Sequence, residues 1–322
     1  MGGRRVGRFR NQSALLAALA IALGVAFGVV LNIAKAQSTF KVDVKLVRLL
    51  VSVKDARGQL VGSLEKPDFT VYDSGVKQDI AIFEHHTEVP LSVSLLIDTS
   101  GSTAKDLRYE TASLEKFIHA LLREGNPDDA AALYSFNDQV TRLNWFTRRE
   151  QRLIDSLKEL RANAGTSFYD AILLSSRDQL RREGRHVIVV VTDGGDTTSD
   201  KKFADAREAA QNADAVVYPI LVTPITNDAG RNLGGERALA TLASDTGGRV
   251  FQPSGPAALD EAFTEILRDL RTQYLIGYYP HNLPADTPRF HMVRVELSRN
   301  DLRATTRTGY YGDASPFGKA AR

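Results

Sequence analysis

The chain has 322 residues, of which 43% are hydrophobic, and this composition excludes an intrinsically disordered protein. Lys and Arg number 41 and Asp and Glu 39, but five of the basic residues and none of the acidic ones lie in residues 1–36, so the remainder has 36 basic and 39 acidic residues and a net charge of −3. That balance argues against nucleic acid or an anionic membrane surface as a partner of the mature protein.

The first 36 residues are typical of an export signal. A basic start precedes an apolar run from Ala14 to Leu31, and Ala34-Lys35-Ala36 forms a small-residue cleavage site before Gln37. We therefore expect a signal peptide over 1–36 and a periplasmic or extracellular protein, for which the absence of cysteine is no obstacle. Because the apolar run just reaches the length of a membrane helix, an uncleaved inner-membrane anchor is the alternative.

Residues 38–89 are predicted to form a small antiparallel β module. The stretch FKVDVKLVRLLVSVKD alternates in polarity, ARGQ follows as a turn, and FTVYD and IAIFE are further short strands.

The pattern changes over residues 90–272, where short apolar runs alternate with helical stretches. This alternation predicts a doubly wound, Rossmann-like α/β domain with a mostly parallel central sheet and helices on both faces. The expected strands are LSVSLLI, AAALYSF, HVIVVVT, AVVYPILV and RVFQ, with QVTRLNWFT as an antiparallel edge strand. Apolar residues at helical spacing predict one helix from Leu107 to Leu122, and further helices are expected near 149–160, 168–182, 201–213, 235–245 and 256–271.

Strand patterns return over residues 273–313, before a short tail at 314–322. The strands are YLIGYYP, FHMVRVELS and LRATTRTGYY, whose tyrosines we interpret as packing or edge aromatics. Because small isolated sheets are marginal, we expect 273–313 to pair with 38–89 in one module, with the α/β domain inserted between them.

Three polar clusters follow strands or precede a helix of the α/β domain. They are Asp98-Thr99-Ser100-Gly101-Ser102, Gly165-Thr166-Ser167 and Asp193-Gly194-Gly195-Asp196. Loops at the carboxyl ends of parallel strands converge, so these clusters are expected at one edge of the sheet. They supply carboxylates and hydroxyls without imidazole or thiolate, which favours a hard cation such as Mg²⁺. The candidate metal ligands are Asp98, Ser100, Ser102, Thr166 and Asp193.

Other interpretations of these clusters are weaker. Ordinary helix capping by Ser, Thr and Asp would need no metal. An aspartic protease would need a second Asp-Thr-Gly copy, and a haloacid-dehalogenase-type phosphatase would need a second Asp where Ser100 stands. A serine hydrolase would need a Gly-x-Ser-x-Gly elbow, which the sequence lacks. We therefore expect no enzymatic activity.

The ordered set Asp98-x-Ser100-x-Ser102, Thr166 and Asp193 resembles the metal-ion-dependent adhesion site of von Willebrand factor type A (VWA) domains. The flanking DFTVYDSGVKQDIAIF, YLIGYYP and TGYYG are similar to the VWFA-related proteins common in acidobacteria. The resemblance implies that the two serines and the threonine contact the metal directly or nearly so, and that the aspartates bind it directly or through water. The ion would be Mg²⁺, with Mn²⁺ or Ca²⁺ as alternatives.

The expected function is that of an exported adhesion or complex-assembly module. A metal ion with few protein carboxylates keeps positive charge and open positions, so a partner protein could supply an Asp or Glu to it. The alternative is a structural envelope-assembly protein with a vestigial metal site, and a hydrolase ranks third. The sequence leaves the oligomeric state and the identity of the partner open.

Overall fold

The computed structural model describes residues 46–85, 89–103, 107–222, 232–284 and 287–312, all within one compact unit, Lys45–Arg322. The expected signal peptide and the tail at 314–322 lie outside the described residues. Within the described ranges, none of the helices combines the length and hydrophobicity that a membrane crossing requires.

A five-stranded sheet forms the centre of the α/β domain, in the order β7-β6-β5-β8-β9. Strands β5, β6, β8 and β9 are parallel, and β7 pairs antiparallel with β6, which confirms the predicted edge strand. The bounds are β5 Leu91–Asp98, β6 Ala130–Phe136, β7 Val140–Thr147, β8 Arg185–Thr192 and β9 Ala215–Leu221.

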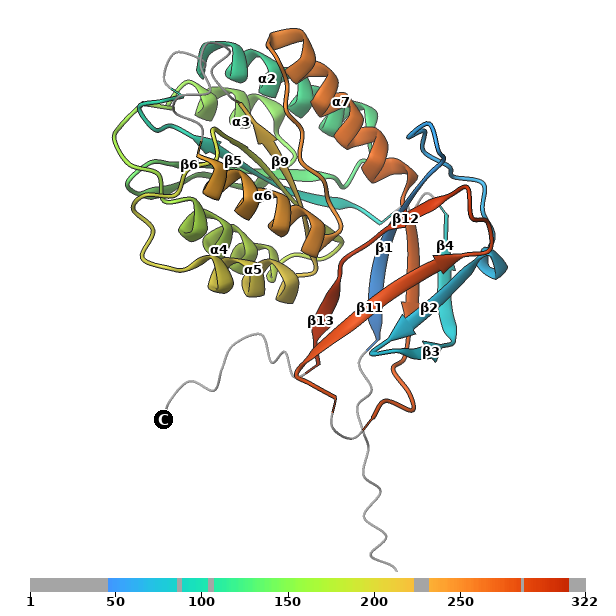
Figure 1. Cartoon of the computed structure of the whole chain (residues 1–322). Coiled ribbons are helices and arrows are strands. Elements are labelled where there is room, and N and C mark those ends of the chain that lie inside the picture. The colour runs from blue at the N-terminus through green and yellow to red at the C-terminus, as the bar shows by residue number, and fades with distance from the viewer. Residues whose placement is uncertain (1–45, 86–88, 104–106, 223–231, 285–286, 313–322) are drawn as a thin grey trace, which may run out of the picture. The chain divides into compact units, whose positions relative to one another are not determined.

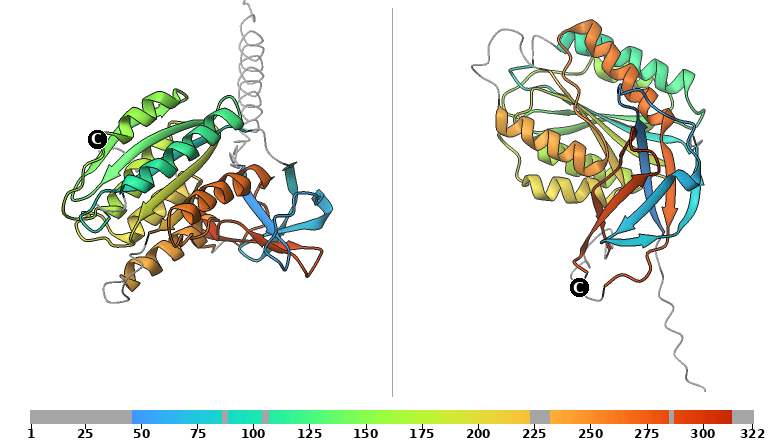
Figure 2. Two further views of the ribbon diagram at one scale, coloured as in Figure 1. Left: turned by 90° about the horizontal axis from the view of Figure 1, so that it is seen from above. Right: turned by 45° about the vertical axis from the view of Figure 1, so that its right-hand side comes forward.

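Helices cover both faces of this sheet, as Figures 1 and 2 show. Helices α2, α3 and α7 pack on one face, and α4, α5 and α6 on the other. Their bounds are α2 Leu107–Glu124, α3 Glu150–Leu157, α4 Phe168–Gln179, α5 Phe203–Asn212, α6 Leu233–Thr246 and α7 Pro256–Thr272. All six lie close to the predicted positions, and the predicted doubly wound α/β class is confirmed.

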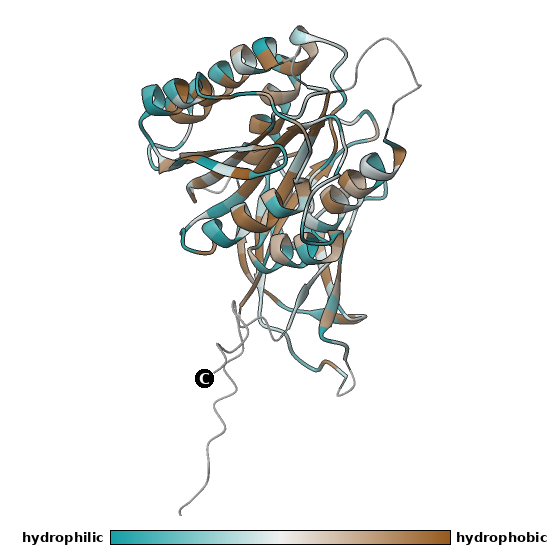
Figure 3. Ribbon diagram, turned by 90° about the vertical axis from the view of Figure 1, so that its left-hand side faces the viewer, coloured by the Kyte–Doolittle hydropathy of each residue, from teal (hydrophilic) through white to brown (hydrophobic). Residues whose placement is uncertain are grey.

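The unbroken apolar run of β8 follows from this double cover. Val187, Val189 and Val191 enter the core under α2 and α7, whereas Ile188 and Val190 enter the core under α4 and α6. Successive side chains of a strand point to opposite faces, so a strand buried on both faces needs apolar residues at every position. Figure 3 shows the result as hydrophobic strands between two layers of helices.

The fifth predicted strand, RVFQ at 249–252, is wrong as an extended strand. Only an isolated parallel bridge joins Phe251 to Ile220 of β9. Gly247, with φ of 86°, ends α6 directly before this run, and Pro253 follows it, so little backbone is left for a ladder.

Two antiparallel four-stranded sheets form the second part of the unit, in the orders β12-β1-β10-β4 and β13-β11-β2-β3. Strand β1 pairs with β10 and β12, and β2 pairs with β11, so the two flanking segments of the chain do pair with each other as expected. The bounds are β1 Val47–Lys54, β2 Phe69–Asp73, β3 Val76–Gln78, β4 Ile80–Glu84, β10 Tyr274–Tyr278, β11 Phe290–Leu297, β12 Arg303–Thr305 and β13 Gly309–Tyr311, with a short 3-10 helix at Lys66–Asp68.

The two antiparallel sheets form a β-sandwich, and local sequence explains its turn between β2 and β3. Asp73 of β2 pairs with Val76 of β3, so Ser74 and Gly75 are the two turn residues. Their φ angles are 48° and 85°, the left-handed values that two-residue hairpins use.

Among the described residues of the sandwich, Asp73 has its carboxylate buried in the interior. Asp73 is fully buried, and its Oδ2 accepts hydrogen bonds from the hydroxyls of Tyr278, at 3.0 Å, and Tyr310, at 2.7 Å. These tyrosines are therefore packing residues, as interpreted, that also join β10 and β13 to β2.

Candidate metal site

The three polar clusters lie at the carboxyl edge of the five-stranded sheet. Strand β5 ends at Asp98, β8 ends one residue before Asp193, and the loop with Thr166 leads into α4. Ligands bind at this edge in open α/β sheets because the loops and helix N-termini meet there.

Hydrogen bonds join each cluster to another. Thr192 donates its hydroxyl proton to Asp98 Oδ2 at 2.6 Å, which joins the end of β8 to the end of β5. The amide of Asn163 donates to the carbonyl of Thr99 at 2.9 Å. The amide of Thr166 donates to the hydroxyl of Thr197 at 2.9 Å. The folded chain therefore brings all three clusters to one place.

The five predicted ligands differ in how they are held. Asp98 is fully buried, and its Oδ1 accepts the amide of Ser100 at 2.9 Å. The hydroxyls of Ser100 and Ser102 lie 3.1 Å apart and share a hydrogen bond. The Thr166 hydroxyl and the half-buried Asp193 carboxylate form no hydrogen bond with any of the described residues, so both remain available to a ligand.

Two negative carboxylates at this site, Asp98 and Asp193, are unfavourable unless a cation offsets their charge. The pKa of Asp98 is raised to about 6, mainly by burial and to a smaller extent by the nearby Asp193, while the hydrogen bonds from Thr192 and Ser100 act in the opposite direction. A divalent cation between the two carboxylates would offset both the burial and the repulsion. The donor set therefore fits a hard cation with oxygen ligands.

The N-terminus of α4 is capped by side chains other than those of the predicted metal ligands. Ser167 precedes α4 without capping it through its side chain. Instead, Asp196 Oδ2 accepts the amide of Tyr169 at 2.9 Å, and Ser199 Oγ accepts the amide of Asp170 at 3.2 Å. The loop after β8 thus caps α4, and the expected metal ligands are not used for this purpose.

Sequence reasoning missed Thr192, which orients the Asp98 carboxylate. Its position as the last residue of a buried strand, next to Asp193, is the signal that could have identified it, because a hydroxyl there faces the neighbouring strand end. Across the described ranges no group of three or more His, Cys, Asp and Glu residues has the arrangement of a metal site. The candidate site has two carboxylates, and hydroxyls supply its other oxygens.

Comparison with known proteins supports the fold. Residues 93–195 match the family model of the von Willebrand factor type A domain. No curated protein matches the sequence.

Several solved structures are similar. The vWF domain of the type V pili tip protein Mfa5 from Porphyromonas gingivalis is 16% identical, with a TM-score of 0.46 over 56% of this chain and 94% of that one. BatB from Bacteroides thetaiotaomicron is 18% identical, with a TM-score of 0.45 over 56% of this chain and 100% of that one. The PilB minor pilin from Streptococcus sanguinis is 14% identical, with a TM-score of 0.46 over 57% and 62%.

The matched segment runs from Val93 in β5 to Gly195 after β8, and so contains all three polar clusters. Together with the strand order and the helices on both faces, this match shows that the chain contains a domain of the von Willebrand factor type A fold.

Proposed function

We propose that this protein is an exported, metal-dependent protein-binding module that uses a bound Mg²⁺ ion to dock an acidic residue of a partner. In this proposal Asp98, Ser100, Ser102, Thr166 and Asp193 form a complete metal-ion-dependent adhesion site. The protein acts in adhesion or complex assembly and not as an enzyme. Its export and its likeness to acidobacterial VWFA-related proteins remain predictions from the sequence.

One observation carries the proposal: the buried Asp98 and the unpaired Asp193 meet at the sheet edge beside a free Thr166 hydroxyl. With only two protein carboxylates around it, a divalent ion would keep residual positive charge and open positions among its usual six. Ser102 and Gly101 are exposed, so the outer side of the site is open to solvent and to a partner. A carboxylate from another protein would meet a cation there that still lacks ligands.

Metal binding is tested by calorimetric titration of Mg²⁺, Mn²⁺ and Ca²⁺ into the full chain, together with thermal unfolding. We expect saturable binding and a rise in Tm that grows with metal concentration, because a ligand that binds only the folded state stabilises it. Asp98→Ala should abolish both effects. Asp200→Ala is the matched control, because this exposed carboxylate lies in the same loop region as Asp193 but outside the ligand set.

The docking step is tested separately, by capture of partners from envelope extract with Mg²⁺ or with a chelator. A partner retained only with Mg²⁺, and lost on replacement of its Asp or Glu, supports docking through the metal. Metal-independent capture would instead favour the structural envelope-assembly role with a vestigial site. Failure of Mg²⁺ to bind the wild-type chain would remove the proposal altogether.

A further inference from the structure

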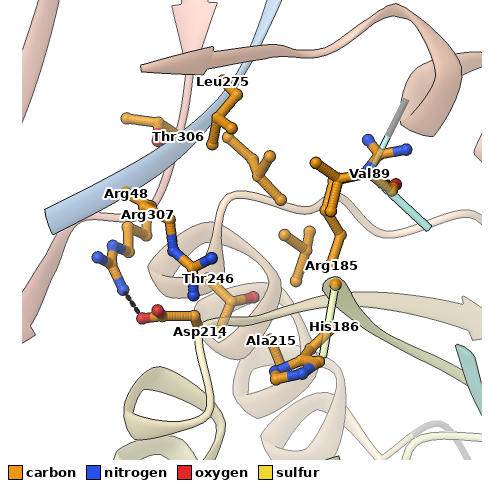
Figure 4. A pocket seen from close by; sticks show the side chains of 13 residues that line it. Arg48, Val89, Arg185, His186, Asp214, Ala215, Thr246, Leu275, Thr306 and Arg307 are labelled. Atoms are coloured by element: carbon orange, nitrogen blue, oxygen red, sulfur yellow. Dashed lines mark hydrogen bonds and ion pairs between the residues drawn. The ribbon is translucent and has the colours of Figure 1, made fainter. Parts of the chain in front are cut away.

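A second candidate site lies at the other end of the five-stranded sheet, between the α/β domain and the β-sandwich. The pocket encloses about 60 Å³ and is lined from β1, from the start of β8 and β9, and from the segment after β12 (Figure 4). Strand β8 separates it from the candidate metal site, because Arg185 begins this strand and Thr192 ends it. An eight-residue strand spans roughly 23 Å, so the two sites share no residue.

Donors without partners gather in this pocket. Arg48 is exposed and forms no hydrogen bond or ion pair with the described residues. Arg307 is 8% exposed and pairs through Nη1 with Asp214, yet its buried Nε has no partner among the described residues. The buried hydroxyl of Thr306 likewise has none. Buried polar groups are nearly always hydrogen-bonded, so the Thr306 hydroxyl and Arg307 Nε indicate a missing acceptor, and the exposed Arg48 adds a charged donor to the same lining.

The other polar side chains of the pocket already have partners within the protein. Arg185 donates to the carbonyls of Val89, at 3.2 Å, and Leu270, at 2.6 Å, and Figure 4 shows its guanidinium turned toward Val89. Both ring nitrogens of His186 face backbone carbonyls. The one carboxylate of the lining, Asp214, is committed to Arg307. The pocket therefore has an excess of positive charge, because Arg48 has no counter-ion among the described residues and Arg307, although paired with Asp214, keeps an unused Nε donor.

The size and walls of the pocket restrict the occupant. Leu50, Val216 and Leu275 form apolar walls, and the enclosed volume admits a group of only a few heavy atoms. A water molecule could accept from Thr306 or Arg307, but it would not balance the charge of Arg48. Guanidinium groups bind carboxylate and phosphate oxygens through paired N–H donors.

We infer that this pocket binds a compact oxyanion, of the size of inorganic phosphate or of a single carboxylate group, through Arg48, Arg307 Nε and the Thr306 hydroxyl. The anion would contact the sandwich through these three residues. Neither Mg²⁺ nor the proposed partner is required for this binding.

The inference is tested by titrating phosphate, and separately acetate, into the full chain in metal-free buffer at constant ionic strength set with chloride. We expect saturable binding of at least one of them, with a Kd on the order of 1 mM, and a rise in the urea midpoint. The two titrations distinguish a free phosphate from a carboxylate as the natural ligand.

The variants assign the binding to this pocket. Arg48→Ala should weaken it about tenfold, since one charge-assisted contact is lost, and it should leave the fold intact because Arg48 has no partner. Arg57→Ala is the matched control, because Arg57 is exposed and its side chain also lacks a partner among the described residues. Asp98→Ala should have no effect on anion binding. The absence of saturable binding by both anions, or equal binding in wild type and Arg48→Ala, overturns the inference.

Discussion

At the scale of single residues, the candidate metal site depends on the interactions that stabilise the buried carboxylate of Asp98. Asp98 lies at the end of a strand that is buried throughout its length, and burial is the main cause of its raised pKa. Thr192 and the Ser100 amide each donate a hydrogen bond to it, which recovers part of the lost solvation. These contacts keep the carboxylate in position, but they do not remove the cost of its charge.

Replacing Asp98 by Asn should therefore stabilise the metal-free protein at pH 7.5 by up to about 3 kcal/mol. The folded-state pKa of Asp98, about 6, lies above 3.8, the ordinary value of an aspartate, which we take for the unfolded chain. Its contribution to stability is thus present below pH about 4 and is lost as the pH rises through 6. Urea unfolding at several pH values measures this difference, which should shrink toward pH 5. A variant that is less stable than wild type at pH 7.5 without metal would contradict the argument.

Thr192→Val tests the positioning of Asp98. Valine keeps the volume but removes the donor to Asp98 and the acceptor for the Gly194 amide, which lies 3.2 Å from the hydroxyl. We expect a loss of stability of about 1–3 kcal/mol and Mg²⁺ binding weakened about tenfold. Thr192→Ser, which retains the hydroxyl, should restore most of the Mg²⁺ affinity in the same calorimetric titration. Equal affinities of the Val and Ser variants would show that the hydroxyl does not position Asp98.

At the scale of elements, the sequence predicts best what a local pattern determines. Strand β8, whose side chains enter the two cores alternately, and helix α2, with one apolar face, both lie where expected. The buried residues of the α2 face include Leu114, Ile118 and Leu121. Both patterns are local signals. The run around Phe251 shows the limit of local patterns. Whether these four residues form a full strand depends on where α6 ends and on the following Pro253, and only one bridge to β9 forms here. Likewise, the capping of α4 by Asp196 depends on a hydrogen bond from Tyr169, which lies 27 residues away in the sequence.

The packing of α6 against the loop after β8 provides an element-scale prediction. A Cβ at Gly235 would lie 1.3 Å from the carbonyl oxygen of Gly194, so Gly235→Ala must displace the start of α6 or the loop that carries Asp193. We expect lower Mg²⁺ affinity and a lower Tm, although Gly235 is not a ligand. Gly234→Ala is the control, since its Cβ would make only an ordinary contact at 3.4 Å with Asn232. Similar effects of the two substitutions would contradict this role of the loop.

At the scale of the whole molecule, the two cores of the α/β domain come from one continuous stretch of the chain, whereas the core of the β-sandwich comes from two. Both cores of the α/β domain come from residues between Leu91 and Leu270, apart from partly buried contacts such as Leu50. The core of the β-sandwich combines residues from both ends of the described chain, from Val47 to Leu302. Tyr278 and Tyr310 add hydrogen bonds to Asp73 across this division. The sandwich therefore cannot be completed until the α/β domain has been synthesised.

Three fragments, of residues 90–272, 46–272 and 46–312, test this dependence. A fragment of residues 90–272 should fold, because it contains both of its cores, whereas a fragment of residues 46–272 should leave its N-terminal strands unfolded. In the latter, β1 loses both neighbours, β10 and β12, and an isolated strand with unpaired backbone groups has no independent stability. Amide hydrogen exchange should show β1 unprotected in 46–272 and protected in 46–312, while β5 and β8 stay protected in all three fragments. If β1 is equally protected in 46–272 and 46–312, the N-terminal strands do not need the C-terminal ones, and the sandwich is not a single module.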